Sequence, residues 1–261
     1  MNEFLARLSQ ATPPSAAIAL FWLEQSHFIF KTPEGLIIHV DPFLSRTIKP
    51  ENFIHPEPLI KPEEAVAGYA FLTHDHRDHT DPDTVGPMAR AFPKCRFVGP
   101  AEACARCRSC GIAPERLAEM KENDEKDFGA FKVKAVYAQN TSDHDATAHF
   151  GFIFDFAGLR VYHAGDTRKD PDEYAARLGA IKGLRPDAML IAINEGYNNP
   201  GPQGAARLVE MVAPRLIVPC HYDCFKKNTI VPQRFLDALP APRRATVRIL
   251  RRGESILITT K

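Results

Sequence analysis

The stretch FLTHDHRDHTDP, residues 71–82, decides how this sequence is interpreted. An apolar run typical of a β-strand ends at residue 73, and side chains that can bind a metal crowd the six residues after it. These side chains are His74, Asp75, His76, Asp78 and His79. On an extended backbone His74 and His76 project to the same side, so both imidazoles can reach one cation. Asp78 and His79 turn the other way, toward a second cation. A solvated polar loop is the alternative, but three histidines beside carboxylates at this spacing are uncommon by chance. The stretch therefore predicts a two-metal site.

Two further ligand candidates follow apolar runs that resemble strands. RVYHAGDT, residues 160–167, places Asp166 directly after a strand, where Gly165 allows the backbone a tight bend. A carboxylate can bridge two cations with its two oxygens. RLIVPCHYD, residues 215–223, places His221 after another strand. Alone, Asp166 and His221 would be an ordinary turn residue and an ordinary histidine, but beside the first motif they complete a ligand set.

Short apolar runs rich in β-branched and aromatic residues predict about a dozen strands. They occupy residues 17–23, 27–30, 35–40, 68–73, 96–99, 131–137, 149–156, 159–165, 188–193, 215–220, 246–250 and 255–260. Helical segments lie between them, several with proline at the first position, at residues 82–92, 100–110, 171–184, 202–212 and 232–239. Two strand-rich blocks, residues 16–69 and 131–165, each precede alternating helix and strand. This order predicts an α/β protein with two similar sheets and outer helices.

Together, the HxHxDH motif at 74–79, the GDT motif at 165–167 and the strand-terminal His221 resemble the metallo-β-lactamase fold superfamily of metal-dependent hydrolases. The resemblance covers nearly the whole chain. It implies one domain over residues 1–261, an αββα four-layer sandwich of two packed mixed β-sheets with helices on the outer faces. Three further stretches resemble the L-ascorbate 6-phosphate lactonase-like branch: residues 21–43, INEGYNNPG at 193–201, and VPCHYDCFKKNTIVPQRF at 218–235.

Carried over to this sequence, the resemblance implies one or two divalent ions per chain, Zn²⁺ or Mn²⁺. The first ion would be bound by His74 and His76, and the second by Asp78, His79 and His221. Asp166 would bridge them. The region 135–152 would supply the third histidine of the first ion: His144 is the choice, with His149 and Asn140 as alternatives. Asp41 would orient one ligand histidine, since ligand imidazoles need a partner on the other nitrogen. Its alternative is a turn residue before Pro42.

The chemistry implied is hydrolysis by metal-activated water, with Asp78 or Asp166 as the catalytic proton acceptor. Polar residues near the ligands in sequence are candidates for substrate binding, or else loop surface: Arg77, Asn194, Tyr222 and Asn228. The predicted substrate is a small polar molecule, such as a sugar-derived, phosphorylated lactone. Two alternatives are a phosphodiesterase or nuclease with the same metal site, and a non-catalytic metal-binding protein.

The amino-acid composition limits the classes of molecule that this protein is expected to bind. Lys plus Arg number 33 against 32 for Asp plus Glu, a net charge of +1, so we expect no nucleic-acid partner. No apolar run approaches the ~20 residues of a membrane span, and no signal peptide is evident, so a cytoplasmic protein without a membrane partner is expected. Association into homo-oligomers stays open.

The cysteines raise one separate possibility. Cys104, Cys107 and Cys110 form C-x2-C-x2-C, which matches the start of an iron–sulfur ligand run without its closing residues. The alternative is that they are small apolar residues along one side of a helix.

Overall fold

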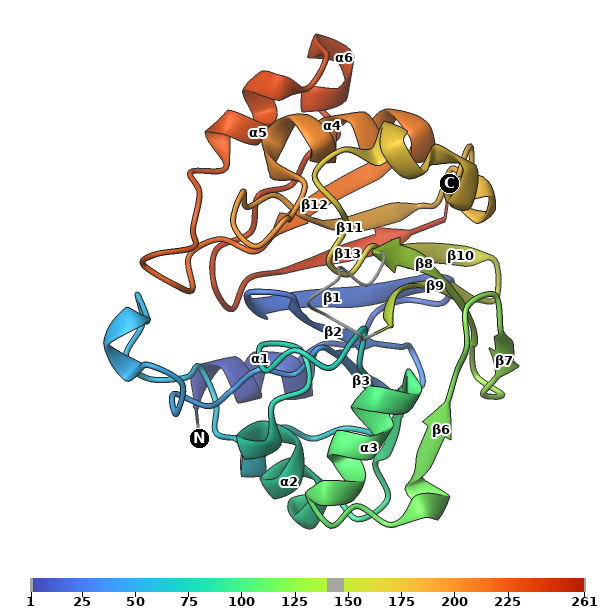
Figure 1. Cartoon of the computed structure of the whole chain (residues 1–261). Helices are drawn as coiled ribbons and strands as arrows, with labels where there is room; N and C mark the ends of the chain where they lie inside the picture. Colours follow the sequence, from blue (N-terminus) through green and yellow to red (C-terminus); the bar gives the residue numbers. More distant parts are fainter. Residues whose placement is uncertain (1, 140–147, 261) are drawn as a thin grey trace. The chain divides into compact units, whose positions relative to one another are not determined.

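The computed structural model describes residues 2–139 and 148–260 (Figure 1). By its internal contacts the chain divides into two compact units. The first comprises Met1–Met120 with Arg251–Thr259, and the second comprises Lys121–Leu250 with Thr260–Lys261. Each unit contains one mixed β-sheet with helices, which confirms the predicted α/β class and the two mixed sheets. That residues 1–261 form a single domain stays a prediction.

The first unit is built on a seven-stranded sheet in the order β13-β1-β2-β3-β4-β5-β6. The strands are β1 (Ala17–Glu24), β2 (His27–Lys31), β3 (Ile37–Val40), β4 (Tyr69–Phe71), β5 (Arg96–Gly99), β6 (Leu117–Glu119) and β13 (Ser255–Thr259). Pairing is antiparallel from β13 to β3 and parallel from β3 to β6. Because β3 and β4 are parallel, Asp41 and the loop that begins at Leu72 leave the sheet at the same edge.

Three α-helices belong to this unit: α1 (Glu3–Gln10), α2 (Pro82–Ala91) and α3 (Ala101–Ser109). Asp81 caps α2 by accepting a hydrogen bond from the Asp83 backbone N–H, which ends the metal-ligand loop at a defined point. Single 3₁₀ turns occur at Pro50–Asn52, Pro62–Glu64 and Pro114–Arg116. The core between sheet and helices is apolar and includes Phe21, Met88 and Phe97. Helix α1 is absent from the predicted elements.

The second unit is built on a six-stranded sheet in the order β12-β11-β10-β9-β8-β7. Its strands are β7 (Glu125–Asp127), β8 (Lys132–Gln139), β9 (His149–Phe156), β10 (Leu159–His163), β11 (Ala188–Ala192) and β12 (Leu216–Cys220). Strands β10, β11 and β12 are mutually parallel, while β9 is antiparallel to β10. The carboxyl ends of the three parallel strands and the amino end of β9 therefore meet at one edge of this sheet.

Helix α4 (Gly201–Val212) packs against β11, as Figure 1 shows, and α5 (Gln233–Ala238) packs against α4. Helix α6 (Ala241–Arg244) and a 3₁₀ helix, η4 (Pro171–Ala180), complete the unit. No helix within residues 2–139 and 148–260 is long and apolar enough to cross a membrane.

Two predicted elements are wrong. Residues 246–250 form no strand, and only an isolated bridge joins Val247 to Ile217. Helix α6 ends at Arg244, a turn follows at residues 245–246 and another turn begins at Arg252, which leaves little extended chain for a ladder. The segment 171–184 forms the 3₁₀ helix η4 rather than an α-helix. Gly179 and Gly183 weaken any α-helix over this range.

Candidate metal centre

The first unit gathers four of the predicted ligands in the loop after β4. His74 and His79 are fully buried, and the centroids of their rings lie 4.0 Å apart. The Nε2 atom of His74 lies 2.8 Å from the Nδ1 atom of His76. Ligand atoms of Asp78 and His79 lie within 4.8 Å of each other, as do those of His74 and His79. The loop thus concentrates three imidazoles and one carboxylate, donor types that suit Zn²⁺ and Mn²⁺.

Asp41 fixes this loop through hydrogen bonds of its carboxylate group. It is completely buried directly after β3, with a left-handed backbone (φ 47°). Its Oδ1 accepts the Thr73 backbone N–H at 2.7 Å, and its Oδ2 accepts the Thr73 hydroxyl at 2.8 Å. The Nδ1–H of His79 donates to Oδ2 at 2.7 Å. Since Nδ1 carries the proton in this bond, Nε2 of His79 keeps the lone pair that a metal needs.

Three contacts that the sequence did not suggest restrain the rest of the loop. The side-chain amide of Gln25 donates to Asp78 Oδ2 at 2.8 Å. Arg106 of α3 binds both carboxylate oxygens of Asp75, the residue between two of the ligand histidines. The hydroxyl of Thr80 donates to the carbonyl oxygen of His74 at 2.7 Å. Gln25 lies within the stretch 21–43 that carries the family resemblance, whereas nothing in the sequence around Arg106 indicates this contact.

A second pair of histidines lies buried in the same unit and forms a chain of hydrogen bonds. The Phe43 N–H donates to His27 Nδ1, the His27 ring lies 2.9 Å from His39 Nδ1, and His39 Nε2 lies 3.0 Å from the carbonyl oxygen of Val66. Since Val66 can only accept, both rings are neutral donors along this chain. Burial lowers the pKa of His39 to about 4 and also lowers the pKa of His27. Both rings therefore stay uncharged at neutral pH.

The second unit brings Asp166 and His221 together. Asp166 follows β10 through Gly165, whose left-handed backbone (φ 63°) makes the bend that the sequence predicted. His221 follows β12, also with a left-handed backbone (φ 62°). Its Nε2 lies 3.1 Å from Asp166 Oδ1, and both side chains are buried. Because β10 and β12 run in the same direction, the carboxylate of Asp166 and the imidazole of His221 lie at one edge of the second sheet.

His149 lies at the same edge, because β9 begins there and runs antiparallel to β10. The residue is only 2% exposed. Gly151 lets β9 lie close to the end of β10, since a β-carbon at Gly151 would lie 2.8 Å from Cε2 of Tyr162 and 3.0 Å from the carbonyl oxygen of His163. His144 and Asn140, the other candidates for the third histidine position, fall outside the described residues.

The predicted substrate-binding residues have assigned contacts within their own units. The guanidinium of Arg77 is half-exposed and pairs with Asp83 at 2.9 Å. The side-chain amide of Asn194, fully buried after β11, donates to Asn228 Oδ1 at 3.0 Å. The Tyr222 hydroxyl donates to the carbonyl oxygen of Leu250. These hydrogen bonds fix the loops that carry Asn194, Asn228 and Tyr222.

The cysteines do not form a second metal centre in the part of the chain that the structure describes. No cysteine there belongs to a group of three or more potential ligands whose atoms lie within 4.8 Å. Cys104 and Cys107 are buried on α3, and burial raises the pKa of the Cys107 thiol. Burial also raises the pKa of Cys95 to about 12. These thiols therefore pack as small apolar groups.

Comparison with known proteins agrees with this architecture. A protein of Methanosarcina mazei named UPF0173 metal-dependent hydrolase is 29% identical over 92% of this chain and 99% of its own length. The solved structure of Igni18, a metallo hydrolase from Ignicoccus hospitalis, has a TM-score of 0.72 at 22% identity and covers 94% of this chain and all of its own. An isothiocyanate hydrolase from Delia radicum gut bacteria has a TM-score of 0.71 at 18% identity, covering 93% of this chain and all of its own. Likeness at this level shows a shared fold.

The family model of the beta-lactamase superfamily domain matches residues 37–222, which include all the candidate metal ligands and every strand of the second sheet. More than half of the chain lies in this match, and the HxHxDH and GDT motifs fall inside it. The chain therefore has the metallo-β-lactamase fold and belongs to the beta-lactamase superfamily.

Proposed function

We propose that this protein is a metal-dependent hydrolase that acts on a small polar substrate, with a sugar-derived lactone as the specific candidate. The observation that carries the proposal is the loop 74–79, where three imidazoles and a carboxylate converge above a fully buried Asp41. The donor set fits a divalent ion, because neutral imidazole nitrogens and carboxylate oxygens are the ligands of catalytic zinc sites. The name of the Methanosarcina relative, a metal-dependent hydrolase, points the same way.

In this proposal His74, His76, Asp78 and His79 bind metal together with Asp166 and His221. The third histidine position is assigned to His144, with His149 as the alternative. A bound divalent ion would supply a water of lowered pKa and a Lewis acid for the carbonyl group under attack. Asp78 or Asp166 would be the proton acceptor of this site.

Hydrogen bonds within the chain orient the proposed ligands. Asp41 fixes the tautomer of His79, and the Gln25 amide fixes the direction of the Asp78 carboxylate. Each carboxylate oxygen has two lone pairs, so this hydrogen bond leaves acceptor positions on Asp78 for a metal and for a proton. Arg106, through Asp75, restrains the backbone between His74 and His76. Preorganisation of this kind reduces what must be rearranged during turnover.

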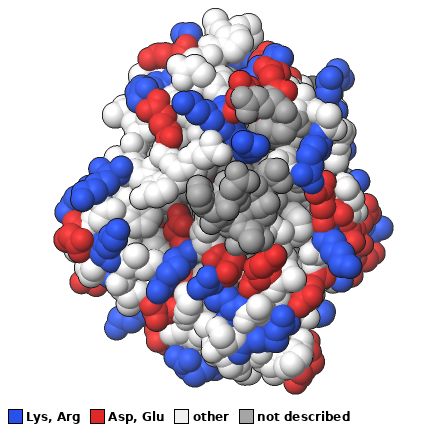
Figure 2. Space-filling view, in the orientation of Figure 1, with Lys and Arg blue, Asp and Glu red and all other residues white. Residues whose placement is uncertain are grey.

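A phosphodiesterase is the second candidate, and the charge distribution argues against a polynucleotide substrate. On the face in view in Figure 2, Lys and Arg side chains are interspersed with Asp and Glu. The net charge of +1 adds no long-range attraction for a polyanion.

The first experiment measures hydrolysis of L-ascorbate 6-phosphate by metal-stripped protein to which Mn²⁺ or Zn²⁺ is returned, with bis(4-nitrophenyl) phosphate in parallel. We expect lactone turnover that depends on the metal, and we expect His76→Ala to abolish turnover and weaken metal binding while the fold persists. His55→Ala is the matched control, because His55 lies outside the ligand loop and the substitution keeps the backbone carbonyl that accepts from Arg46. Turnover of only the diester would favour the second candidate, and unchanged turnover in His76→Ala would overturn the site.

A further inference from the structure

The bend that carries Asp166 begins where β10 leaves the second sheet. His163 is the last residue of β10 and pairs with Leu190 of β11. The backbone N–H of Ala164 still donates to the carbonyl oxygen of Leu190, at 2.9 Å. Gly165 then turns the chain with its left-handed backbone, and Asp166 follows. The direction of the Asp166 carboxylate therefore depends on the conformation of Gly165.

The imidazole of His163 binds the backbone at this bend. The Gly165 N–H donates to His163 Nδ1 at 3.1 Å, and both residues are buried. A buried backbone N–H is costly to leave without an acceptor, so this hydrogen bond opposes rotation of the peptide between Ala164 and Gly165. Because Nδ1 accepts here, the ring proton lies on Nε2. His163 therefore contributes an acceptor at one defined atom, beside a proposed metal ligand.

Strand β9 packs closely against the residues before the bend. A β-carbon at Gly151 would lie 3.0 Å from the carbonyl oxygen of His163 and 3.2 Å from that of Ala164. Both carbonyl groups thus lie directly against β9, while the Ala164 N–H bonds to β11. The chain is fixed by its neighbours in the sheet up to Ala164, and Gly165 is the first residue beyond these contacts.

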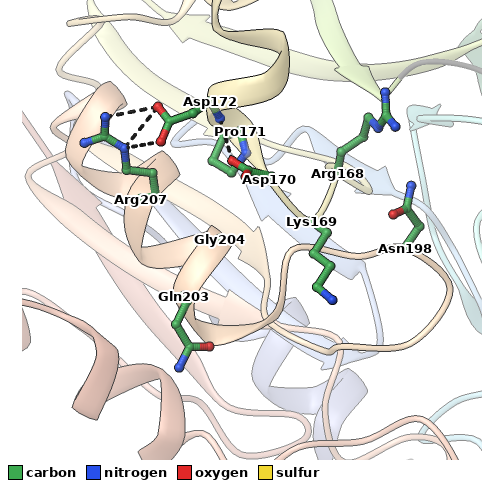
Figure 3. A pocket seen from close by; sticks show the side chains of 9 residues that line it. All are labelled: Arg168, Lys169, Asp170, Pro171, Asp172, Asn198, Gln203, Gly204 and Arg207. Carbon is green, nitrogen blue, oxygen red and sulfur yellow. Dashed lines mark hydrogen bonds and ion pairs between the residues drawn. The ribbon is translucent and has the colours of Figure 1, made fainter.

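The chain after Asp166 is anchored on helix α4. A β-carbon at Gly204 would lie 2.3 Å from the carbonyl oxygen of Lys169, so the backbone at Lys169 lies directly on the first turns of α4. Figure 3 shows Asp172 facing Arg207 of α4. The Arg207 guanidinium donates three hydrogen bonds to that carboxylate, at 2.9, 3.0 and 3.2 Å. Asp166 therefore belongs to a short stretch that is fixed at both ends, in which the bend at Gly165 sets where its carboxylate points.

We propose that His163 is a positioning residue, whose Nδ1 atom holds the Gly165 peptide and thereby keeps the Asp166 carboxylate directed at His221. In this orientation Asp166 Oδ1 lies 3.1 Å from His221 Nε2. The inference rests on the proposed function, because it takes Asp166 and His221 as metal ligands. Ligand atoms must be held to within about 0.5 Å of their working positions, and a rotated peptide moves the side chain that follows it.

Substitution of His163 by asparagine and by glutamine separates the role of Nδ1 from that of packing. The side-chain oxygen of asparagine can take the place of Nδ1, whereas the polar end of glutamine takes the place of Nε2. His163→Asn therefore keeps an acceptor for the Gly165 N–H, and His163→Gln does not. If the imidazole only filled space, the opposite order would be expected, because glutamine is closer to histidine in size and leaves the smaller cavity.

The first readout is made on metal-free protein. Amide hydrogen exchange at Gly165, followed by NMR in the full-length protein, should accelerate at least about tenfold in His163→Gln and less than about threefold in His163→Asn. Equal exchange in the two variants, or faster exchange in His163→Asn, would overturn the proposal. ¹⁵N NMR of the His163 ring in the native protein should show Nδ1 without a proton. This measurement needs no variant to fold, and a protonated Nδ1 would also overturn the proposal.

The second readout is metal affinity, measured by competition with a fluorescent chelator. Zn²⁺ should bind about tenfold more weakly to His163→Gln than to the native protein, and to His163→Asn within about threefold of the native affinity. His55→Gln, the same substitution in the first unit, is the matched control and should change nothing. Equal affinity of the two His163 variants for a metal that the native protein binds would overturn the positioning role. If the native protein binds no divalent ion, or binds one without hydrolysing the lactone, the proposed function fails, while the Gly165 exchange rates still decide whether His163 holds the bend.

Discussion

Replacing Asp41 with asparagine should reverse the tautomer of His79 and weaken metal binding while leaving the fold intact. In the native protein Asp41 accepts three hydrogen bonds, two from Thr73 and one from His79 Nδ1–H. An asparagine can still accept the Thr73 N–H, but it must turn its NH₂ group toward His79. The imidazole then has to accept at Nδ1, so its proton moves to Nε2, the atom that lies 3.6 Å from Asp78 Oδ2. A protonated Nε2 cannot bind a metal.

The effects of Asp41→Asn on stability and on metal affinity can be estimated from the hydrogen bonds that change. The contacts can be remade in reversed polarity, so the free energy of unfolding should fall by about 1 kcal/mol. Loss of an orienting partner typically costs 10–100-fold in metal affinity, or about 1.4–2.7 kcal/mol. Competition with a fluorescent chelator measures the affinity for Zn²⁺ and Mn²⁺, and ¹⁵N NMR of the histidine ring identifies the tautomer. Asp127→Asn, the same substitution at an exposed residue of β7, is the control. Native metal affinity in Asp41→Asn, or a His79 ring still protonated at Nδ1, would refute the reasoning.

Two further predictions concern the first unit. Acid should destabilise the protein between pH 6.5 and about 4, because burial lowers the pKa of His39 to about 4 from its ordinary 6.5. In that window the unfolded chain binds a proton that the folded chain does not. Urea denaturation should therefore show a free energy of unfolding about 2 kcal/mol lower at pH 5 than at pH 7.5. Equal free energies of unfolding at the two pH values would contradict the uncharged state of His27 and His39. Arg106→Gln should cost only about 1 kcal/mol of stability, since the pair with Asp75 is partly exposed, yet lower metal affinity severalfold. Calorimetric titration with Zn²⁺ checks this, and Arg106→Lys, which keeps the charge but loses the two-pronged geometry, should rescue it only in part.

The strands that could be predicted from the sequence are those that bury both faces. Strand β1 is buried at all eight positions and β11 at all five, so an apolar run identifies each of them. The short strands β6 and β7 could not be found this way. They lie at the ends of their sheets and contain the sequences LAE and EKD, and charged residues are common at such edges. Residues 246–250 show the converse error: this run pairs with β12 at the single bridge between Val247 and Ile217, and one bridge does not make a strand.

Some features of the candidate site could likewise be predicted from local sequence, and others could not. The loop 74–79 and the positions of Asp166 and His221 after strands follow from local sequence, because a motif and a strand end are both local features. The contact of Arg106 with Asp75 joins residues 31 positions apart, and the loop after Asp166 lies against α4, where a β-carbon at Gly204 would lie 2.3 Å from the carbonyl oxygen of Lys169. Such contacts arise from tertiary packing and have no local signal. The role of Asp41 could be inferred only because ligand histidines generally need a partner.

The left-handed backbone at His221 has a consequence for how this protein would lose its activity. An L-residue in that conformation costs about 1–2 kcal/mol relative to glycine, so the fold tolerates histidine there against its local preference. A change to asparagine, which adopts this conformation readily and fills part of the buried volume of the imidazole, would offset the packing loss while removing an imidazole from the proposed site. Inactive variants at this position should therefore accumulate in cells as abundant, folded protein rather than being cleared by proteolysis. Measured protein levels would then be a poor guide to activity.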